Sequence, residues 1–363
     1  MNITIIGAGP IGCYCSYLLA KQGHSVDIYE EHKEIGLPIQ CTGLLTSDFD
    51  QFNLSKESFL VNTFEEIEVF SPGGKKASIK QKEYLVDRHK LDLYFAKLAT
   101  EAGVKIHLQH SFLRKEGQHI IIKNNIRHKD VSITPEIIIA ADGPMSKTAK
   151  AYGFYQEERV NYQGVQALVE GRFNPKNYQT FFGKNVCPDL FAWIVPESES
   201  RARIGLASTS KDARKMFESF MSNYNYAVIE MQAGMIPLYC PQQKLQQDNC
   251  YLLGDASTFV KATTLGGLIP GLKQAEILAY CLINDKNYEK EVKELRKRMN
   301  LHLRLRKIFN KFSDKDWDNL IEILAGKKMK KLLSQHTRDS PGPLVLKALL
   351  KEPRLWKFGK KLF

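Results

Sequence analysis

The chain of 363 residues has 43% hydrophobic residues and a formal net charge of +12, and this length suffices for two or three domains with a large core. No apolar run approaches the ~20 residues that cross a bilayer, and no cleavable signal precedes the first predicted strand, which argues against a membrane-spanning or exported protein. Seven widely spaced cysteines without a Cys-x-x-Cys pair predict no metal site and a reducing, cytoplasmic location.

A glycine-rich turn opens the chain. The apolar residues 3–6 are followed by Gly-Ala-Gly-Pro-Ile-Gly at 7–12, by a helical stretch over 13–22 and by a strand over 25–29 that ends at Glu30. In such a unit the first glycine allows a tight turn, the second lets the backbone approach a pyrophosphate, and the third lets the helix pack close to the strand. An acid at the end of the second strand binds ribose hydroxyls. The predicted dinucleotide contacts are Gly7, Gly9, Pro10, Ile11, Gly12 and Glu30.

The following elements alternate between helices and short strands. Short alternating strands from about Tyr152 to Pro241 indicate a separate antiparallel sheet. The predicted elements, in chain order, are strands at 64–71 and 104–109 with a helix ending at Gly103 between them, a hairpin with its turn at Asn124-Asn125, strands at 137–141, 164–170, 191–195 and 202–207, a helix at 211–224, a strand at 251–254 and a long helix at 268–282.

The charge is concentrated at the C-terminal end. Residues 286–363 contain 22 Lys plus Arg and 9 Asp plus Glu, a net +13, whereas residues 1–285 contain 30 and 31, a net -1. A localised basic surface indicates an anionic partner, although a solvated helical surface is the alternative for any single lysine. Within it, residues 343–363 interleave leucines, Trp356 and Phe358 with six basic residues, which suits two short interfacial helices separated at Pro353. Docking of this segment on the protein's own core is the alternative.

Three further segments lie where a cofactor on the first domain needs them. Asp255 follows a buried strand, and the backbone N–H groups of Gly266 and Gly267 lie at the start of a helix, where they suit the anionic edge of a flavin. Asp142 also follows a buried strand. Arg88 lies just before a helix, within reach of a pyrophosphate or, alternatively, as a surface helix cap.

Together these residues resemble the FAD flavoproteins of the glutathione-reductase type, in the branch built like para-hydroxybenzoate hydroxylase. Within that branch the chain is most similar to the geranylgeranyl reductase family, which includes archaeal enzymes that saturate digeranylgeranylglycerophospholipids. The closer resemblance rests on Gly-Leu-Pro-Ile-Gln-Cys-Thr-Gly-Leu at 36–44, Phe-Ala-Trp-Ile-Val-Pro at 191–196, and the segment from Gly254 to Leu268.

The resemblance implies an α/β fold with three parts. It has a discontinuous FAD-binding Rossmann domain at 1–60, 85–150 and 248–285, an antiparallel-sheet substrate domain at 61–84 and 151–247, and the basic helical C-terminal region at 286–363.

The resemblance also implies roles for single residues. Glu30 would bind the adenosine ribose, Gly12 and Arg88 the pyrophosphate, and Asp255 the ribityl chain. The remaining implied contacts are the Phe112 backbone at the adenine, Asp142 at the cofactor, Cys41, Thr42 and Gly43 against the isoalloxazine, Gly266, Gly267 and Leu268 at its pyrimidine edge, and Phe191, Trp193 and Pro196 in the substrate cavity.

Several positions depart from the family or admit a second interpretation. Leu265 stands where the family usually has a glycine, Phe191 replaces a tyrosine, and Ala149 stands where related hydroxylases carry arginine. Cys41 is the candidate catalytic residue, but buried cysteines are more often inert packing residues. Trp193 is a cavity residue by resemblance and a core residue by ordinary strand statistics. No residue is identified as the proton donor.

The implied activity is FAD-dependent reduction of C=C bonds in geranylgeranyl chains of a membrane lipid or its precursors, with NADPH or reduced ferredoxin as the electron donor. The expected partners are the isoprenoid lipid, an electron-donor protein and an anionic membrane at the inner face of the cell membrane, with no nucleic acid. The alternatives are an aromatic monooxygenase or quinone oxidoreductase of the same fold, or a flavin-containing binding protein with a basic tail. A halogenase is disfavoured because residues 191–193 lack paired tryptophans.

Overall fold

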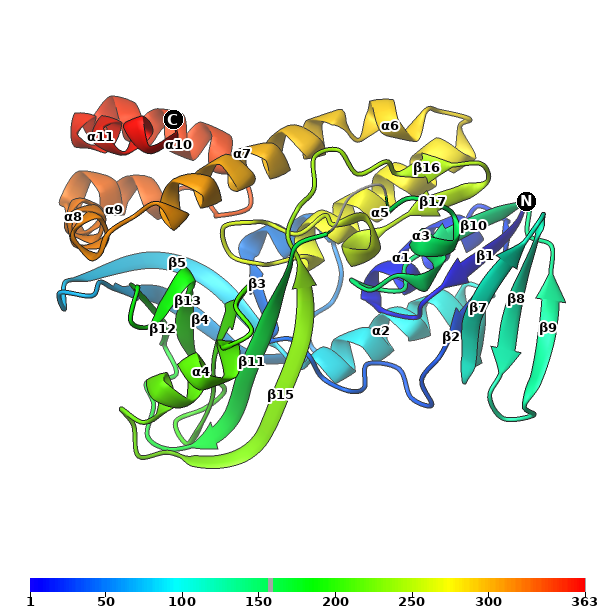
Figure 1. Ribbon diagram of the computed structural model, residues 1–363, viewed down its shortest axis with the longest axis horizontal. Coiled ribbons are helices and arrows are strands. Elements are labelled where there is room, and N and C mark those ends of the chain that lie inside the picture. The colour runs from blue at the N-terminus through cyan, green and yellow to red at the C-terminus, as the bar shows by residue number, and fades with distance from the viewer. Residues whose placement is uncertain (156–158, 363) are drawn as a thin grey trace.

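The computed structural model describes residues 1–155 and 159–362. Two lobes stand side by side, each built on its own sheet, and the C-terminal helices cover one of them (Figure 1). The chain starts in the lobe that carries the glycine-rich turn and crosses between the lobes several times, so both are made of discontinuous segments.

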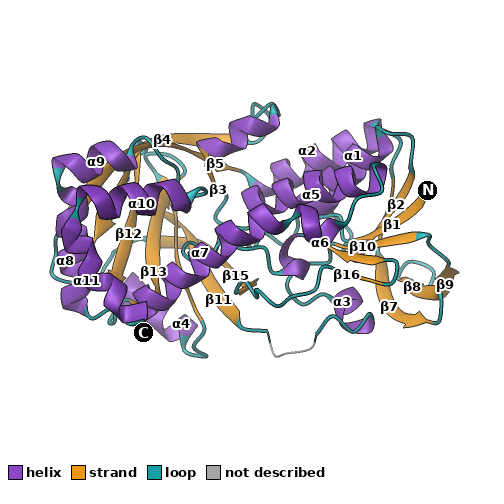
Figure 2. Ribbon diagram, turned by 90° about the horizontal axis from the view of Figure 1, so that it is seen from above, coloured by secondary structure: helices purple, strands orange, loops and turns teal. Residues whose placement is uncertain are grey.

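The first lobe is a three-layer Rossmann-type domain. Its central sheet has the strand order β16 (Gln246–Gln247), β17 (Cys250–Leu252), β10 (Ile137–Ala140), β1 (Asn2–Ile6), β2 (Ser25–Glu30) and β6 (Lys105–Leu108), and only the β16–β17 pair is antiparallel. The helices α1 (Pro10–Ala20), α2 (Arg88–Glu101) and α5 (Leu268–Ile283) form one layer, and a small sheet of β7 (His110–Glu116), β8 (His119–Asn124) and β9 (Lys129–Ile133) forms the other (Figure 2).

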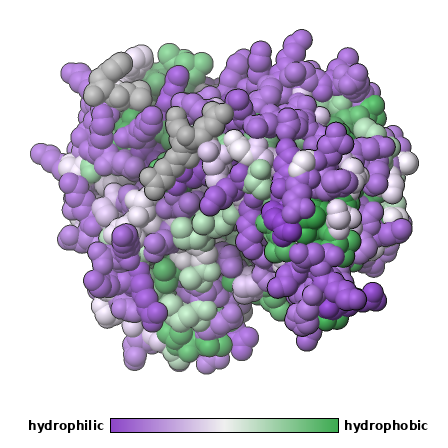
Figure 3. Space-filling view, turned by 45° about the vertical axis from the view of Figure 1, so that its right-hand side comes forward, coloured by the Kyte–Doolittle hydropathy of each residue, from purple (hydrophilic) through white to green (hydrophobic). Residues whose placement is uncertain are grey.

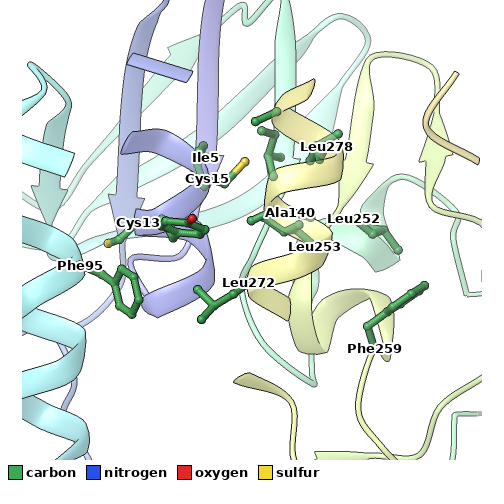
Figure 4. Packing of buried hydrophobic residues seen from close by; sticks show 14 of the residues in the cluster. Ile5, Cys13, Cys15, Phe95, Ala140, Leu252, Leu253, Phe259, Leu272 and Leu278 are labelled. Carbon is green, nitrogen blue, oxygen red and sulfur yellow. The ribbon is translucent and has the colours of Figure 1, made fainter. Parts of the chain in front are cut away.

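The core of this lobe explains the apolar strands. Because both faces of the parallel sheet are covered, β1 and β10 have buried side chains on both sides and read as continuous apolar runs. Figure 4 shows Phe95 of α2 beside Cys13 of α1, Ile5 beside Cys15, and Ala140 of the sheet beside Leu253, near the helix α5 that carries Leu272 and Leu278. The predicted strand–turn–helix unit at the N-terminus and the long helix at 268–282 are confirmed.

The second lobe is an eight-stranded sheet. Its strand order is β15 (Ala227–Pro237), β11 (Asn161–Glu170), β14 (Arg201–Ser208), β13 (Cys187–Pro196), β12 (Asn177–Gly183), β4 (Leu60–Phe70), β5 (Lys76–Val86) and β3 (Leu44–Thr46). All neighbours are antiparallel except β4 and β12, which pair in parallel. The segment Leu44–Thr46 pairs with β5 here, although the sequence assigned residues 1–60 to the FAD-binding domain. This pairing is long-range, so no local pattern announces it.

The two faces of this sheet have different neighbours. Ala192 and Ile194 pack under α4 (Ala213–Met221) against Phe217 and Phe220. Trp193 lies between Ala192 and Ile194 in β13, and it points to the opposite face because side chains alternate along a strand. Its partner across the sheet, Gly205 of β14, lies on the same face. The edge strand β15 exposes four large apolar side chains, those of Val228, Ile229, Met231 and Met235. Figure 3 shows apolar side chains gathered on the surface of the molecule.

The C-terminal region is a helical layer. It contains α6 (Tyr288–Glu291), α7 (Lys293–Asn310), α8 (Asp314–Ala325), α9 (Lys327–Leu333), α10 (Pro341–Lys351) and α11 (Trp356–Gly359). Phe312, Trp317 and Phe358 belong to its core, and the Trp317 ring lies against the ring of Phe182 of β12, tilted by 31° with 4.2 Å between the ring centres. The predicted interruption at Pro353 is confirmed, because α10 ends at Lys351 and a 3-10 turn begins at Pro353. Among the described residues, no helix is both long and apolar enough to cross a bilayer.

We expect His302 of α7 to make the protein sensitive to acid. The side chain is 1% exposed, its Nδ1 lies 2.7 Å from the Thr263 hydroxyl, and burial followed by the nearby Lys261 charge lowers its pKa from 6.5 to about 3. The unfolded chain therefore takes up a proton below pH 6.5 and the native chain does not. This difference lowers the free energy of unfolding by about 2–3 kcal/mol between pH 7.5 and 4.5.

Urea unfolding at the two pH values measures this effect. His302→Gln should remove that part of the pH dependence, whereas His128→Gln, at an exposed histidine, should retain it. An equal pH dependence in His302→Gln and the wild type would contradict the assignment.

Candidate functional site

The glycine-rich turn between β1 and α1 has no room for side chains at two of its three glycines. Gly7 has a φ of +104°, and a Cβ there would lie 2.4 Å from the Ala141 carbonyl oxygen. A Cβ at Gly12 would lie 2.3 Å from the Gly7 carbonyl oxygen. A Cβ at Gly9 would meet nothing within 4 Å, so the space above this residue is open to a ligand. The tight turn at Gly7 and the close packing at Gly12 agree with the expected local geometry, and the approach of Gly9 to a pyrophosphate stays a prediction.

Glu30 is fixed beside this turn at the end of β2. One carboxylate oxygen accepts the Ala8 N–H at 2.8 Å, and the other accepts the His32 N–H at 2.9 Å and lies 2.6 Å from the His32 ring. The residue is 9% exposed. Its position and orientation suit a carboxylate that binds the hydroxyls of a ribose placed over the turn.

Two helix N-termini offer unpaired donors. The backbone N–H groups of Ile11 and Gly12 in α1, and those of Gly266, Gly267 and Leu268 at α5, have no acceptor among the described residues. Neither helix has a side-chain cap. Free N–H groups and the helix dipole together make both ends suitable for anionic groups.

Asp255 lies against the second of these helix ends. Its Oδ1 would be 2.8 Å from a Cβ at Gly267, and its carboxylate accepts no hydrogen bond from the described part of the chain. Burial raises the pKa of Asp255 to about 6, opposed by the nearby Arg88 charge. Hydroxyl groups that donate hydrogen bonds stabilise a buried carboxylate that has no other donor, and the ribityl chain of a flavin carries such hydroxyl groups.

Arg88 connects several of the predicted residues. Its guanidinium donates to Asp92 at 3.1 and 3.2 Å, and it interacts with Cys41 and, at longer range, with Asp255. The cap of α2 is Asp87, which accepts the Lys90 N–H at 3.1 Å, so Arg88 does not cap this helix. The hydrogen bonds to Asp92 hold the positively charged guanidinium between the lobe with the glycine-rich turn and the 36–43 loop.

The 36–43 loop ties the two lobes together. Gly43 has a φ of +87°, and a Cβ there would lie 2.3 Å from the Val86 carbonyl oxygen. The Cys41 Sγ accepts the Gly43 N–H at 3.4 Å. The Thr42 hydroxyl donates to Gln166 of β11 at 2.8 Å. Cys41, Thr42 and Gly43 therefore lie between the Arg88 side chain and the large sheet.

A row of polar side chains on the large sheet was missed by sequence reasoning. Gln166 donates to Gln232 at 2.7 Å, Arg203 donates to the same Gln232 oxygen at 2.9 Å, and Arg203 also donates to Glu197 at 2.7 Å. Gln166 and Gln232 are each 5% exposed. The only signal in the sequence was a glutamine inside an otherwise apolar strand, which alternation places on the face opposite to α4.

The aromatic residues predicted for the substrate cavity pack near the loop before α5, residues 261–267. Phe191, Trp193 and Leu265 belong to one apolar cluster, with Phe191 and Trp193 edge to face at 6.3 Å. Leu265 has a φ of +55°, the left-handed conformation that favours glycine. The buried Trp193 Nε1 has no partner among the described residues. Pro196 lies at the buried end of β13, where its carbonyl accepts from Asn62 at 3.2 Å.

Two predicted residues have clear structural duties. Asp142 accepts from the Ser146 hydroxyl and from the Thr148 N–H at 3.0 Å, which holds the start of α3 (Lys147–Ala151). Burial raises the pKa of Asp142, opposed by these hydrogen bonds. Phe112 is a buried core residue of β7, and β7 is an edge of its small sheet, so its outer backbone groups face away from β8.

A cavity of about 390 Å³ borders the start of α5 but not the glycine-rich turn. Its polar lining residues are Ser47, Asp48, Gln51, Lys273, Arg298, Asp339 and Ser340. The cavity therefore lies between α5 and α7, beside the N-terminus of α5.

Substitution of single glycines should separate folding from binding. Gly9→Ala fits the observed φ of -65° and open space, so the free energy of unfolding should stay unchanged or rise by up to about 1 kcal/mol. FAD binding should be lost, because the methyl group occupies the open space. Gly12→Ala should lower the free energy of unfolding by about 2–3 kcal/mol, because its Cβ overlaps the Gly7 carbonyl.

Urea unfolding of both variants, with fluorescence titration of FAD, measures these effects. Unaltered FAD affinity in Gly9→Ala would show that the dinucleotide does not lie over the turn.

Comparison with known proteins supports the fold and the resemblance. Residues 5–67 match the family of NAD(P)-binding Rossmann-like domains. The chain is 28% identical to the digeranylgeranylglycerophospholipid reductase of Methanocaldococcus jannaschii, over 99% of this chain and 98% of that protein. The crystal structure of a geranylgeranyl bacteriochlorophyll reductase-like protein from Thermoplasma acidophilum matches with a TM-score of 0.86 and 21% identity, over 100% and 99% of the two chains. A myxobacterial FAD-dependent halogenase matches with a TM-score of 0.65 and 15% identity, over 95% and 96%.

Proposed function

We infer that this chain, a full-length relative of the digeranylgeranylglycerophospholipid reductases, is an FAD-dependent oxidoreductase that reduces C=C bonds in geranylgeranyl chains of membrane lipids or their precursors. The observation that carries the proposal is the meeting of three separate segments. Arg88 at the start of α2 lies beside the loop at 41–43, its charge acts on Asp255 of the segment 255–268, and Leu265 of that segment packs against the same apolar cluster as the aromatic residues of β13.

The residues present fit FAD from one end to the other. Glu30 would hold the adenosine ribose, the free N–H groups of α1 with Arg88 the pyrophosphate, and Asp255 the ribityl hydroxyls. The unpaired N–H groups of Gly266, Gly267 and Leu268 would bind the pyrimidine edge. When bound, FAD supplies two-electron hydride chemistry. The protein's own contribution is to orient this group and exclude water from it.

The apolar wall supports an isoprenoid substrate. Phe191, Trp193 and Leu265 pack against one buried apolar cluster, on the side of the large sheet that faces the loop before α5. A prenyl chain has no hydrogen-bonding groups, so an apolar wall is what its recognition requires. Cys41, which lies beside Arg88 in the 36–43 loop, is the side chain that we propose to take part in catalysis. NADPH or reduced ferredoxin would supply the electrons, and the basic C-terminal region suits an acidic protein donor.

The C-terminal helices support a peripheral position on an anionic membrane at the inner face of the cell membrane. Leu346 and Leu350 of α10 are 63% and 71% exposed, and Trp356 is 62% exposed. Lysines at 347, 351, 357, 360 and 361 alternate with them. Exposed leucines with an aromatic residue and flanking lysines are typical of segments that lie in the membrane interface. Phe358 packs on Phe312, so the same segment is also docked on the protein.

Reduction of a defined lipid tests the activity. The FAD-loaded protein, reduced with dithionite without oxygen, should add two mass units per double bond to a digeranylgeranylglycerophospholipid, as measured by mass spectrometry.

Trp193→Ala should lower the rate of lipid reduction at least tenfold, because it opens the apolar wall. Cys41→Ser should lower the rate and leave FAD binding intact. An unchanged lipid in the presence of bound, reduced FAD would reject the substrate, and NADPH-dependent oxygen uptake with an aromatic substrate would favour a monooxygenase.

Vesicle flotation tests the membrane surface. The protein should bind vesicles rich in phosphatidylglycerol and release at high salt. The triple variant Leu346→Ser, Leu350→Ser, Trp356→Ser should weaken binding at least tenfold, because it removes the exposed apolar groups. The matched control Leu113→Ser, Ile126→Ser alters apolar residues exposed on the other lobe and should bind normally. Equal binding by both variants would contradict this surface.

A further inference from the structure

Two adjacent residues of the C-terminal region insert opposite charges into the interior. Arg338 and Asp339 lie between α9 and α10. Arg338 pairs with Glu83 of β5 at 2.7 Å and donates to the Tyr178 hydroxyl, while Asp339 pairs with Lys261. Glu83 is fully buried, and Asp339 and Lys261 are 6% and 4% exposed. Buried ion pairs are costly unless each partner is satisfied, so this arrangement requires an explanation.

Asp339 is satisfied from two directions. One carboxylate oxygen accepts from the Lys261 ammonium, and the other accepts from the Thr46 hydroxyl at 2.6 Å. Despite burial, which acts in the other direction, the Lys261 charge and the Thr46 hydroxyl hold the pKa of Asp339 below its ordinary value. Asp339 is therefore ionised at neutral pH, and one acid connects the C-terminal helices with β3 and with the segment that carries Lys261.

Lys261 lies directly under the loop that starts α5. Its Cε and Nζ would be 2.9 and 3.2 Å from a Cβ at Gly266. Its backbone closes the same loop, since the Lys261 carbonyl accepts the Leu265 N–H at 2.8 Å and its N–H donates to Gly266 at 3.3 Å. The unpaired N–H groups of Gly266 and Gly267 are therefore presented by a loop that rests on the Lys261 side chain.

We propose that Asp339 is a positioning residue for the flavin: it holds Lys261 under the Gly266–Gly267 loop and neutralises its charge there. The proposal rests on the proposed function, because it places the flavin at this loop. With the pair intact, the loop offers backbone N–H groups and no net side-chain charge. Burial lowers the pKa of Lys261, and Asp339 opposes this shift. Without Asp339, Lys261 below its lowered pKa is an uncompensated ammonium beside the loop; without Lys261, an uncompensated carboxylate lies there. Asp339 lies two residues before α10. The C-terminal region therefore sets the charge beside the Gly266–Gly267 loop, where we place the pyrimidine edge of the flavin.

The midpoint potential of bound FAD tests this role. At a pH below the lowered pKa of Lys261, Asp339→Asn should raise the potential, because the free ammonium favours the more negative, reduced flavin. Lys261→Met should lower it for the opposite reason. We expect at least a tenfold change in the reduced-to-oxidised ratio in each direction, or about 30 mV for a two-electron couple. The double variant should return close to the wild type. Glu322→Gln, which breaks the exposed pair with Lys75, is the control and should have no effect.

Opposite shifts separate electrostatic positioning from general damage, because loosened packing moves both potentials in the same way. Shifts of the same sign, or no shift in either variant, would overturn the proposal. Thr46→Val removes only a hydroxyl to Asp339 and keeps both charges, so it serves if the charge variants fold poorly. It should leave the potential within 10 mV of the wild type, roughly a twofold change in the ratio, and loosen the loop.

Hydrogen exchange of the FAD-free protein gives a readout that does not need the cofactor. Amides of residues 261–268 should exchange at least tenfold faster in Asp339→Asn and in Thr46→Val than in the wild type, and Glu322→Gln should not differ. Unchanged exchange in both would contradict the positioning role even if FAD binds. Failure of the wild-type protein to bind FAD would instead reject the proposed function and leave the exchange result to be judged alone.

Discussion

The closeness of two backbones at the β1–α1 turn is the constraint on which the rest of the structure depends. The Gly7 carbonyl lies so near Gly12 that a Cβ there would be 2.3 Å from it, and Gly7 itself meets Ala141. This packing places the N-terminus of α1, with its unpaired N–H groups, at the carboxyl edge of the parallel sheet. Ligands of doubly wound sheets bind at that edge. Asp255 and the start of α5 reach the same edge because β17 is parallel to β10.

The second lobe contributes a surface of different chemistry. One face of its sheet is used up by α4, and the other carries Trp193, Phe191 and the polar row of Gln166. The Thr42–Gln166 hydrogen bond and the ion pairs of Arg338 and Asp339 fix this face against the cofactor lobe. Buried polar contacts of this kind contribute little net stability but define one arrangement of two domains. The Asp339–Lys261 ion pair also connects the basic C-terminal helices, which suit a membrane surface, with the loop before α5, which suits the flavin.

The sequence predicted what is local and missed what is long-range. The glycine spacing, the apolar run of β1 and the position of Glu30 at the end of β2 each depend on neighbouring residues, and the strand, turn, helix and second strand lie where they were predicted. The binding roles of these residues stay predictions. The parallel pairing of β4 with β12 and the placement of Leu44–Thr46 in the large sheet join residues far apart in the chain. The Lys261–Asp339 pair spans 78 positions, so no periodicity reveals it. Leu265 illustrates the intermediate case: its departure from glycine was visible, but only the structure shows that the backbone is left-handed and that its side chain packs against the same buried cluster as Trp193.

The most direct test of the central claim is whether a prenylated lipid takes electrons from the flavin of this protein. FAD bound to the protein is reduced without oxygen, the lipid is added, and the flavin absorbance is followed. The account predicts that absorbance returns only with the unsaturated lipid, in proportion to the double bonds reduced, and not with the saturated lipid. A flavin that stays reduced with both lipids and is oxidised only when oxygen enters would contradict it.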